Sequence, residues 1–173
     1  MPGSILLARR LQGAYAPPPE WLSPSLPERV RLANLSADHG RLTELERDCH
    51  PPGHVDRERA LELIAEGSFR RLLDGALLGP IVPTASGEAE DDLHRVLGMC
   101  IVVQWAGVSP WPGGPWVADI CVRPAQQGRG IGTAMLKHAI AACAALGAAR
   151  VGLAVTRGNR AMSLYERFGF SVL

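Results

Sequence analysis

The chain has little lysine, little net charge and no long apolar run. Of its 18 basic residues only Lys137 is a lysine, and a net charge of +1 provides no basic surface for nucleic acid. No stretch approaches the roughly 18 consecutive apolar residues of a membrane span, and residues 1–10 lack the apolar core of a secretory signal. We therefore expect no nucleic-acid or membrane partner and a cytoplasmic location. The many Arg, Ala, Gly and Pro residues indicate a GC-rich bacterial genome.

The cysteines show no paired spacing. They stand alone in the sequence, at Cys49, Cys100, Cys121 and Cys143. Three lie in apparent core elements, so we expect buried free thiols in a reducing compartment. Cys49-His50 with His54 has the residue types of a metal site. The intervening Pro-Pro-Gly favours a turn, however, and no further ligand is nearby, so we expect no metal.

A length of 173 residues is typical of one domain with a real core. Residues 1–27 are proline-rich, and we expect them to form an extended, mobile arm. Residues 28–173 are expected to form the single domain. Periodicity predicts strands over 29–35, 76–84, 96–105, 116–122 and 150–155, and a last strand after Gly169. It predicts helices over 37–49, 57–74, 130–146 and about 159–168, with an acidic loop over 86–92.

The most informative segment is Q-G-R-G-I-G, from Gln127 to Gly132, between a predicted strand and a predicted helix. Glycine lets the backbone approach a ligand closely, and the first N–H groups of a helix have no partner inside it. Together with the helix dipole these groups can hold phosphate oxygens, and Arg129 adds a cation. A tight turn that binds nothing is the competing interpretation.

Three phosphate-binding schemes compete for this turn. A Walker-type loop needs Lys and then Ser or Thr after its last glycine, whereas Gly130 is followed by Ile-Gly-Thr. A dinucleotide fingerprint needs G-x-G-x-x-G and an acid about twenty residues on, but the strand over 150–155 carries no acid. The third scheme is Q-x-x-G-x-G, which Gln127, Gly130 and Gly132 satisfy.

A second motif follows. Residues 159–170 carry an apolar stripe at helical spacing and match the pattern N…A-x-x-L-Y-x-x-x-G-F. The two motifs in this order resemble the GNAT superfamily of N-acetyltransferases, well over residues 95–173 and loosely before that. The resemblance implies an α/β fold with a central twisted mixed sheet flanked by helices. In that fold the strand before the glycine loop and the next strand splay apart to take the pantetheine arm of acetyl-CoA.

The resemblance also implies roles for residues that bind acetyl-CoA, the acyl donor. The pyrophosphate loop comprises Gln127, Gly128, Arg129, Gly130, Ile131, Gly132 and Thr133. The backbone of Ile120, Cys121 and Val122 would pair with pantetheine as an added strand, and an N–H, at Val122, would polarise the thioester carbonyl. The acceptor would be a primary amine of a small molecule or peptide, attacking directly in a ternary complex.

Two residues are catalytic candidates. Tyr165 has a phenol with a pKa near 10, which can return a proton to the departing thiolate. Its alternative role is to complete the apolar stripe, with its hydroxyl hydrogen-bonded. Asp119 interrupts an apolar strand, and an acid buried there costs free energy unless it has a partner or a function. It is a candidate base for the amine or an anchor for the acceptor, and a structural, hydrogen-bonded Asp is the alternative.

The chain departs from the family pattern in two places. The family Asn usually lies seven residues before the Tyr, where this chain has Gly158. Asn159 is therefore a candidate for the pantetheine contact or for a plain N-cap. Members normally add a strand after Gly-Phe, so either a partner, such as a second copy in a homodimer, or the N-terminal segment covers that sheet edge, or the sequence is shortened.

The acceptor is not specified by the sequence. Three tryptophans in the Gly/Pro-rich loop over 105–116 can line an aromatic pocket or pack a hairpin. The acidic residues of the two early helices can attract a polyamine or an aminoglycoside, or form a solvated face. A non-catalytic acyl-CoA-binding module is the alternative function.

Overall fold

The computed structural model describes residues 3–173, so the first two residues of the expected arm lie outside it. A seven-stranded mixed sheet runs in the order β2-β3-β4-β5-β6-β1-β7. Its strands are β1 (Ser4–Arg10), β2 (Val30–Ala33), β3 (Gly87–Asp91), β4 (Val96–Trp105), β5 (Gly114–Val122), β6 (Arg150–Thr156) and β7 (Ser171–Val172). The helices are α1 (His39–Cys49), α2 (Arg57–Ala65), α3 (Ser68–Leu73), α4 (Ile131–Ala145) and α5 (Met162–Arg167). Short 3₁₀ turns are η1 (Gly13–Tyr15), η2 (Pro19–Leu22) and η3 (Pro124–Gln126).

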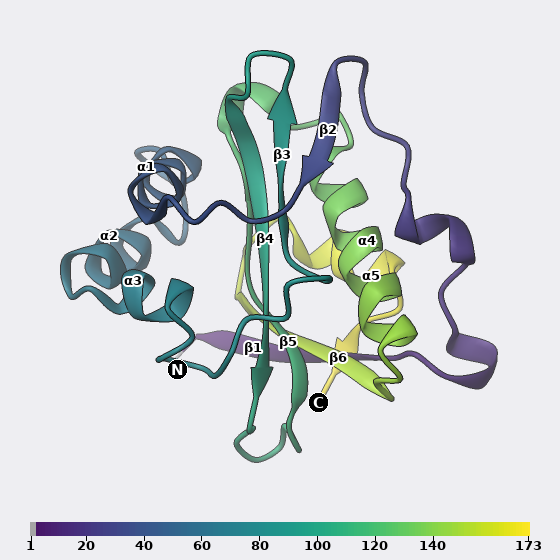
Figure 1. The fold of residues 1–173 in the computed structure, drawn as a ribbon. Coiled ribbons are helices and arrows are strands. Elements are labelled where there is room, and N and C mark those ends of the chain that lie inside the picture. Colours follow the sequence, from purple (N-terminus) through teal and green to yellow (C-terminus); the bar gives the residue numbers. More distant parts are fainter. Residues whose placement is uncertain (1–2) are drawn as a thin grey trace.

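Helices cover both faces of the sheet (Figure 1). Alternate residues of β4 point to opposite faces, as the period of a strand requires. Met99 and Ile101 join the core under α1 and α3, whereas Cys100 and Val102 join the core under α4 and α5. The expected mixed sheet flanked by helices is confirmed. Among the described residues no helix is both long enough and apolar enough to cross a bilayer.

The expectation of an extended arm over residues 1–27 is wrong for its first part. Residues 4–10 form β1, which pairs antiparallel with β6 on one side and with β7 on the other. Further along, Trp21 of η2 packs edge-on against Phe168 at 5.2 Å, and the Lys137 ammonium lies 5.7 Å from the Trp21 ring. The N-terminal segment therefore covers the edge of β6, one of the alternatives that the sequence left open.

The acidic loop expected over 86–92 is instead strand β3, and no named strand forms over 76–84, where only Ile81 makes an isolated bridge. Two glutamates of β3, Glu88 and Glu90, are buried at 2% and 5% exposure. Arg31 and Arg41 donate to Glu90 at 3.0 and 3.1 Å. Glutamate is uncommon in strands, but here Arg31 and Arg41, which are distant in sequence, stabilise the buried acids of β3.

The single helix expected over 57–74 is divided in two. Gly67 adopts a φ of +70° between α2 and α3, a conformation that favours glycine and ends the first helix. Helix α1 is capped by Asp38, whose carboxylate accepts from the Arg41 N–H at 3.1 Å.

The tryptophans of the β4–β5 hairpin pack against one another. The rings of Trp105 and Trp116 lie 4.7 Å apart and those of Trp111 and Trp116 lie 5.2 Å apart. Trp111 and Trp116 are buried. These contacts favour the hairpin-packing interpretation of the tryptophans over an open aromatic pocket. Gly152 of β6 lies beneath them, and a Cβ there would lie 2.6 Å from the Trp116 ring and 2.9 Å from the Trp111 ring.

Gly152→Ala is expected to destabilise the protein by about 3 kcal/mol. The Trp111 and Trp116 rings are buried and packed against each other, so they cannot move away from an added methyl group. In a chain of this length that destabilisation corresponds to a drop in Tm of about 6–12 °C. Thermal unfolding measures it, with Gly132→Ala as the control, since a Cβ at Gly132 meets only Val122 Cγ2 at 3.4 Å. Equal Tm values for the two variants would contradict the packing argument.

Candidate active site

Strands β5 and β6 form an opening at the centre of the sheet. They pair in parallel only at Trp116–Gly152 and Val117–Leu153, although β5 continues to Val122 and β6 to Thr156. The expected splay is therefore present. A bulge at Ala118 shifts the register between β4 and β5 just before Asp119. Bulges of this kind redirect side chains, so the opening begins where Asp119 is placed.

The backbone of β5 faces this opening without a strand partner. Its other side remains paired with β4, and the Arg123 N–H donates to Leu97 O at 2.8 Å. Successive residues of a strand direct their N–H groups to opposite sides. The N–H groups of Val122 and Ile120 therefore point away from β4 and toward the opening, where an extended ligand can pair with them.

The glycine-rich loop lies at the end of β5. Gly128 and Gly130 have φ values of +76° and +87°, and a Cβ at either position would meet no atom within 4 Å. Glycine is therefore required here by backbone conformation, and the surface above the loop is open. Gln127 Nε2 donates to Val122 O at 3.0 Å and fastens the loop to the strand. Arg129 is exposed and contacts the Gln126 side-chain oxygen.

The first N–H groups of α4 are available to a ligand. Helix α4 begins at Ile131 with Gly130 as its cap, and no side chain caps it. Its first turn brings the N–H groups of Ile131, Gly132 and Thr133 together without partners inside the helix. This is the arrangement that binds phosphate groups at helix N-termini.

A buried pair of carboxyl groups adjoins the opening. Glu46 of α1, Asp119 and Cys121 each place one polar atom within 4.8 Å of the others. Glu46 Oε2 and Asp119 Oδ2 are both inaccessible and have no partner among the described residues. Burial raises the pKa of Glu46 to about 7, and burial and then Glu46 raise the pKa of Asp119. The two carboxyl groups interact through their side chains, and this raises the pKa of Asp119, so we expect the pair to retain a proton.

Glu46→Gln is expected to reduce the pH dependence of stability. Because the folded-state pKa is raised from 4.5 to about 7, the stabilisation is present below pH 4.5 and is lost as pH rises to 7. The shift amounts to about 3 kcal/mol. Urea unfolding from pH 4 to 8 should show this fall for the native chain and for the exposed control Glu44→Gln, and a smaller fall for Glu46→Gln, in which the buried Asp119 still titrates. The same slope in all three chains would contradict the assignment.

Tyr165 of α5 belongs to the core on the α4 face of the sheet. Its side chain is 7% exposed and its ring packs edge-on against Phe170 at 6.0 Å. Burial raises the pKa of the phenol, with the Cys100 thiol, Asp119 and Asp56 as the next causes. The phenol therefore stays protonated at neutral pH and lies within the electrostatic reach of Asp119.

Asn159 is engaged by the protein itself. Its Oδ1 accepts from the Ala161 N–H at 2.8 Å and its Nδ2 donates to Asp56 Oδ2 at 2.7 Å. The structure thus supports a local turn at the start of α5 and a tie to the α1–α2 connection. It gives no direct support to the pantetheine contact that the resemblance implies for Asn159.

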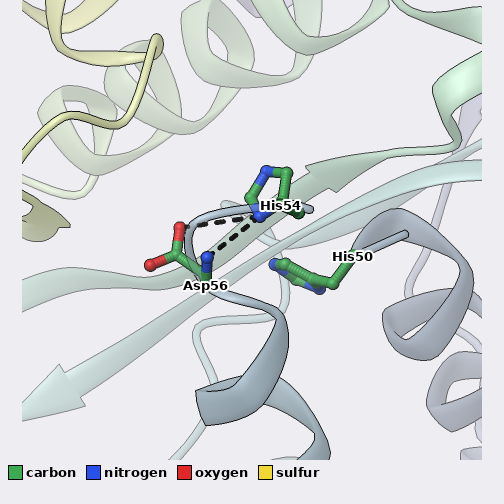
Figure 2. A group of neighbouring side chains, drawn as sticks. All are labelled: His50, His54 and Asp56. Carbon is green, nitrogen blue, oxygen red and sulfur yellow. Dashed lines mark hydrogen bonds and ion pairs between the residues drawn. The ribbon is translucent and has the colours of Figure 1, made fainter. Parts of the chain in front are cut away.

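The α1–α2 connection brings two histidines to the same region (Figure 2). His50 and His54 stack edge-on with ring centroids 4.8 Å apart, and the Asp56 N–H donates to His54 Nδ1 at 3.1 Å. His50 Nδ1 lies 2.9 Å from Glu46 O and 3.3 Å from Glu46 Oε1. Thus His50 links the turn to the buried carboxyl pair.

Glu46 belongs to the site and not to a solvated acidic face of α1, the interpretation that its neighbours in the sequence favoured. A signal was available, because Leu42, Leu45, Glu46 and Cys49 follow the i, i+3, i+4, i+7 spacing of a buried stripe. Burying a carboxylate within such a stripe costs free energy unless a partner compensates its charge, so Glu46 could have been recognised as a site residue. The proximity of Asp56 to Asn159 had no local signal, since 103 positions separate the two residues.

A protein family and several solved structures match this chain. The family described as Acetyltransferase (GNAT) family matches residues 40–170. No curated protein matches the sequence. Among solved structures, a GCN5-related N-acetyltransferase from Sphaerobacter thermophilus has 23% identity and a TM-score of 0.62 over 98% of this chain and 48% of its own. This chain therefore spans about half the length of that protein.

Two other solved structures are of similar length to this chain. A putative acetyl transferase from Pyrococcus furiosus has 21% identity and a TM-score of 0.64 over 82% of this chain and 93% of its own. The PaiA N-acetyltransferase from Thermoplasma acidophilum, solved in complex with coenzyme A, has 21% identity and a TM-score of 0.64 over 83% of this chain and 91% of its own. At these identities the likeness establishes the fold.

Proposed function

Because the chain belongs to the acetyltransferase (GNAT) family, we propose that it transfers an acetyl group from acetyl-CoA to a primary amine of a small molecule or peptide. The observation that carries this proposal is the opening between β5 and β6. It has phosphate-binding geometry at one end, and a buried acid pair and a buried phenol beside it.

The donor lies along β5 in this proposal. The pyrophosphate rests on the N–H groups of the loop from Gln127 to Thr133, and pantetheine pairs with the free backbone edge from Ile120 to Val122. The N–H of Val122 donates to the thioester carbonyl and stabilises the oxyanion. Alignment of the two reactants supplies much of the rate, because acyl transfer from a thioester needs little covalent help.

The amine must be neutral to attack, although a free alkylamine has a pKa of about 10.4. The Glu46–Asp119 pair accepts the amine proton, and a pair that shares one proton carries the negative charge needed to attract a cationic acceptor. The proton passes from the amine to the carboxylate, and the lone pair that is freed forms the bond to the carbonyl carbon. His50, in contact with Glu46, connects this pair to the half-exposed turn.

Tyr165 acts on the leaving group. When the tetrahedral intermediate collapses, the C–S bond breaks and negative charge develops on sulfur. A phenol held neutral by burial donates a hydrogen bond to that sulfur and then its proton, so that coenzyme A leaves as the thiol. The raised pKa keeps the proton on Tyr165 until that charge forms.

Calorimetric titration with acetyl-CoA tests the donor site, with ATP and NAD as controls. We expect selective micromolar binding, weakened about tenfold by Gly130→Ala, since a Cβ at φ +87° strains the turn and blocks the phosphates. Gly147→Ala is the matched control, because Gly147 has φ +82° and open surroundings at the other end of α4. Failure to bind acetyl-CoA, or equal loss in both variants, would refute the loop assignment.

An amine panel with a thiol-release assay then tests transfer. Release of coenzyme A that depends on an added amine supports catalysis. Selective binding of acetyl-CoA without release for any amine would indicate an acyl-CoA-binding module instead.

A further inference from the structure

We propose that His50, His54 and Asp56 form a binding site for a divalent transition metal of the zinc class. Each of the three offers one donor atom, and these atoms lie within 4.8 Å of one another. They come from both ends of the turn that joins α1 to α2 (Figure 2). The expectation of no metal weighed Cys49, His50 and His54 along the sequence, whereas Asp56 becomes a third ligand in the folded chain.

His50 has the second contact that metal-binding histidines require. Its Nδ1 lies 2.9 Å from the backbone oxygen of Glu46, so Nδ1 carries the hydrogen and donates it. This leaves Nε2 with a free lone pair and fixes the plane of the ring. A backbone carbonyl that holds the other ring nitrogen is the usual support for a histidine bound to zinc.

Asp56 is likewise held in place from outside the turn. It occupies the N-cap position of α2, yet its side chain makes no capping hydrogen bond. Its Oδ2 instead accepts from Asn159 Nδ2 at 2.7 Å and lies 4.0 Å from His54 Nδ1. The carboxylate is therefore turned toward His54 and supported by Asn159, as an oriented ligand should be.

His54 is suited to the neutral form that binds metal. Burial lowers the pKa of its imidazole, and the neighbouring His50 lowers it further. Its Nδ1 carries the lone pair and accepts from the Asp56 N–H at 3.1 Å, and a metal bound at Nδ1 replaces this hydrogen bond. Two neutral imidazoles and one carboxylate give the site a charge of −1, which favours a divalent cation.

The donor set and the turn fit a labile site. Two histidines and one carboxylate leave a fourth position for water or another ligand, as in open zinc sites. Zinc bonds of about 2.1 Å place donors about 3.4 Å apart, so the side chains must draw together by about 1 Å. Gly53 gives the turn room for this movement, since it has φ +84° and a Cβ there would meet no atom within 4 Å.

The neighbouring group of Glu46, Asp119 and Cys121 fits a metal less well, although its polar atoms are equally close. Burial is the leading cause of the raised pKa values of both carboxyl groups, and the Cys49 thiol and burial raise that of Cys121. All three groups would have to lose protons inside the core before they could bind a cation. His50, His54 and Asp56 avoid that cost.

Titration of the full chain with Zn²⁺ alone and with Co²⁺ alone tests the proposal. The pH is kept above the ordinary imidazole pKa of about 6.5, so that the histidines are neutral. We expect one equivalent of Zn²⁺ by calorimetry and a visible Co²⁺ absorption band. His54→Ala and Asp56→Asn should abolish the band, and Asn159→Ala should weaken binding about 10–100-fold. His94→Ala, an exposed histidine on another part of the surface, should bind as the native chain does.

Three results would overturn the proposal: no binding of either ion, unchanged binding in His54→Ala, or binding lost in Cys121→Ser but retained in His54→Ala. Circular dichroism identifies misfolded variants, and His54→Gln, which keeps most of the side-chain volume, replaces His54→Ala if that variant does not fold. The readout is metal binding without acetyl-CoA. It is therefore independent of whether the proposed acetyl transfer succeeds or fails.

Discussion

Tyr165→Phe is expected to lower turnover about 10²–10⁴-fold with a saturating amine, while the affinity for acetyl-CoA stays the same. The phenol contributes a proton that is needed only when the C–S bond breaks. The ring itself packs against Phe170 and fills the same space in the variant. The loss should therefore appear in kcat and not in donor binding, which is the signature of an interaction made in the transition state.

The matched control is Tyr15→Phe, which removes the hydroxyl of the chain's other tyrosine, 57% exposed on η1. Steady-state rates of thiol release and calorimetric titration with acetyl-CoA give the two quantities. Unchanged turnover in Tyr165→Phe would leave Tyr165 with a packing role only. A parallel loss of acetyl-CoA affinity would assign the hydroxyl to donor binding.

Asp119→Asn is expected to reduce kcat/KM for the amine about 100-fold and to change its pH profile. In the native chain the acid pair becomes a better proton acceptor as it loses its shared proton, so kcat/KM should rise through about pH 7, the raised pKa of Glu46. An amide accepts no proton from the amine and carries no charge. Glu46 alone remains to titrate in the variant, so the rise should move away from pH 7 and a cationic acceptor should bind more weakly.

Rates measured from pH 5.5 to 9 test this expectation, with Asp92→Asn as the control, an exposed carboxylate that lies 3.7 Å from Arg29 Nε. If KM for the acceptor and the pH profile of Asp119→Asn both match those of the native chain, neither the base nor the anchor role stands. Glu46→Gln measured alongside should resemble Asp119→Asn, and the double variant should lose little more, because the two groups act as one unit.

Local chemistry explains which features were predictable from the sequence. The loop from Gln127 to Gly132 was predictable because glycine conformation and a helix start are determined by a few adjacent residues. The splay of β5 and β6 came from the resemblance and is confirmed by their register. Periodicity predicted a strand over 150–155, and β6 forms there with Val151, Leu153 and Val155 buried.

The features that were missed depend on contacts between distant segments. Composition disfavours a strand containing Glu88 and Glu90, and β3 exists because Arg31 and Arg41 supply partners more than 45 residues away. Similarly, Asp56 resembles an ordinary helix cap until the fold brings Asn159 to it. The buried pair of Glu46 and Asp119 joins a helix to a strand. The two residues are too far apart in the sequence for a local pattern to reveal their contact.

The position of β1 also affects when this protein can fold during synthesis. β1 is synthesised before the other strands of this sheet, yet it pairs with β6 through contacts such as Leu7–Leu153 and with β7 through Leu7–Val172. The sheet therefore cannot be completed before β6 and β7 have been translated. Pairing over such separations is slow, and until β6 is available the apolar face and open edges of β1 are exposed to pairing with other chains.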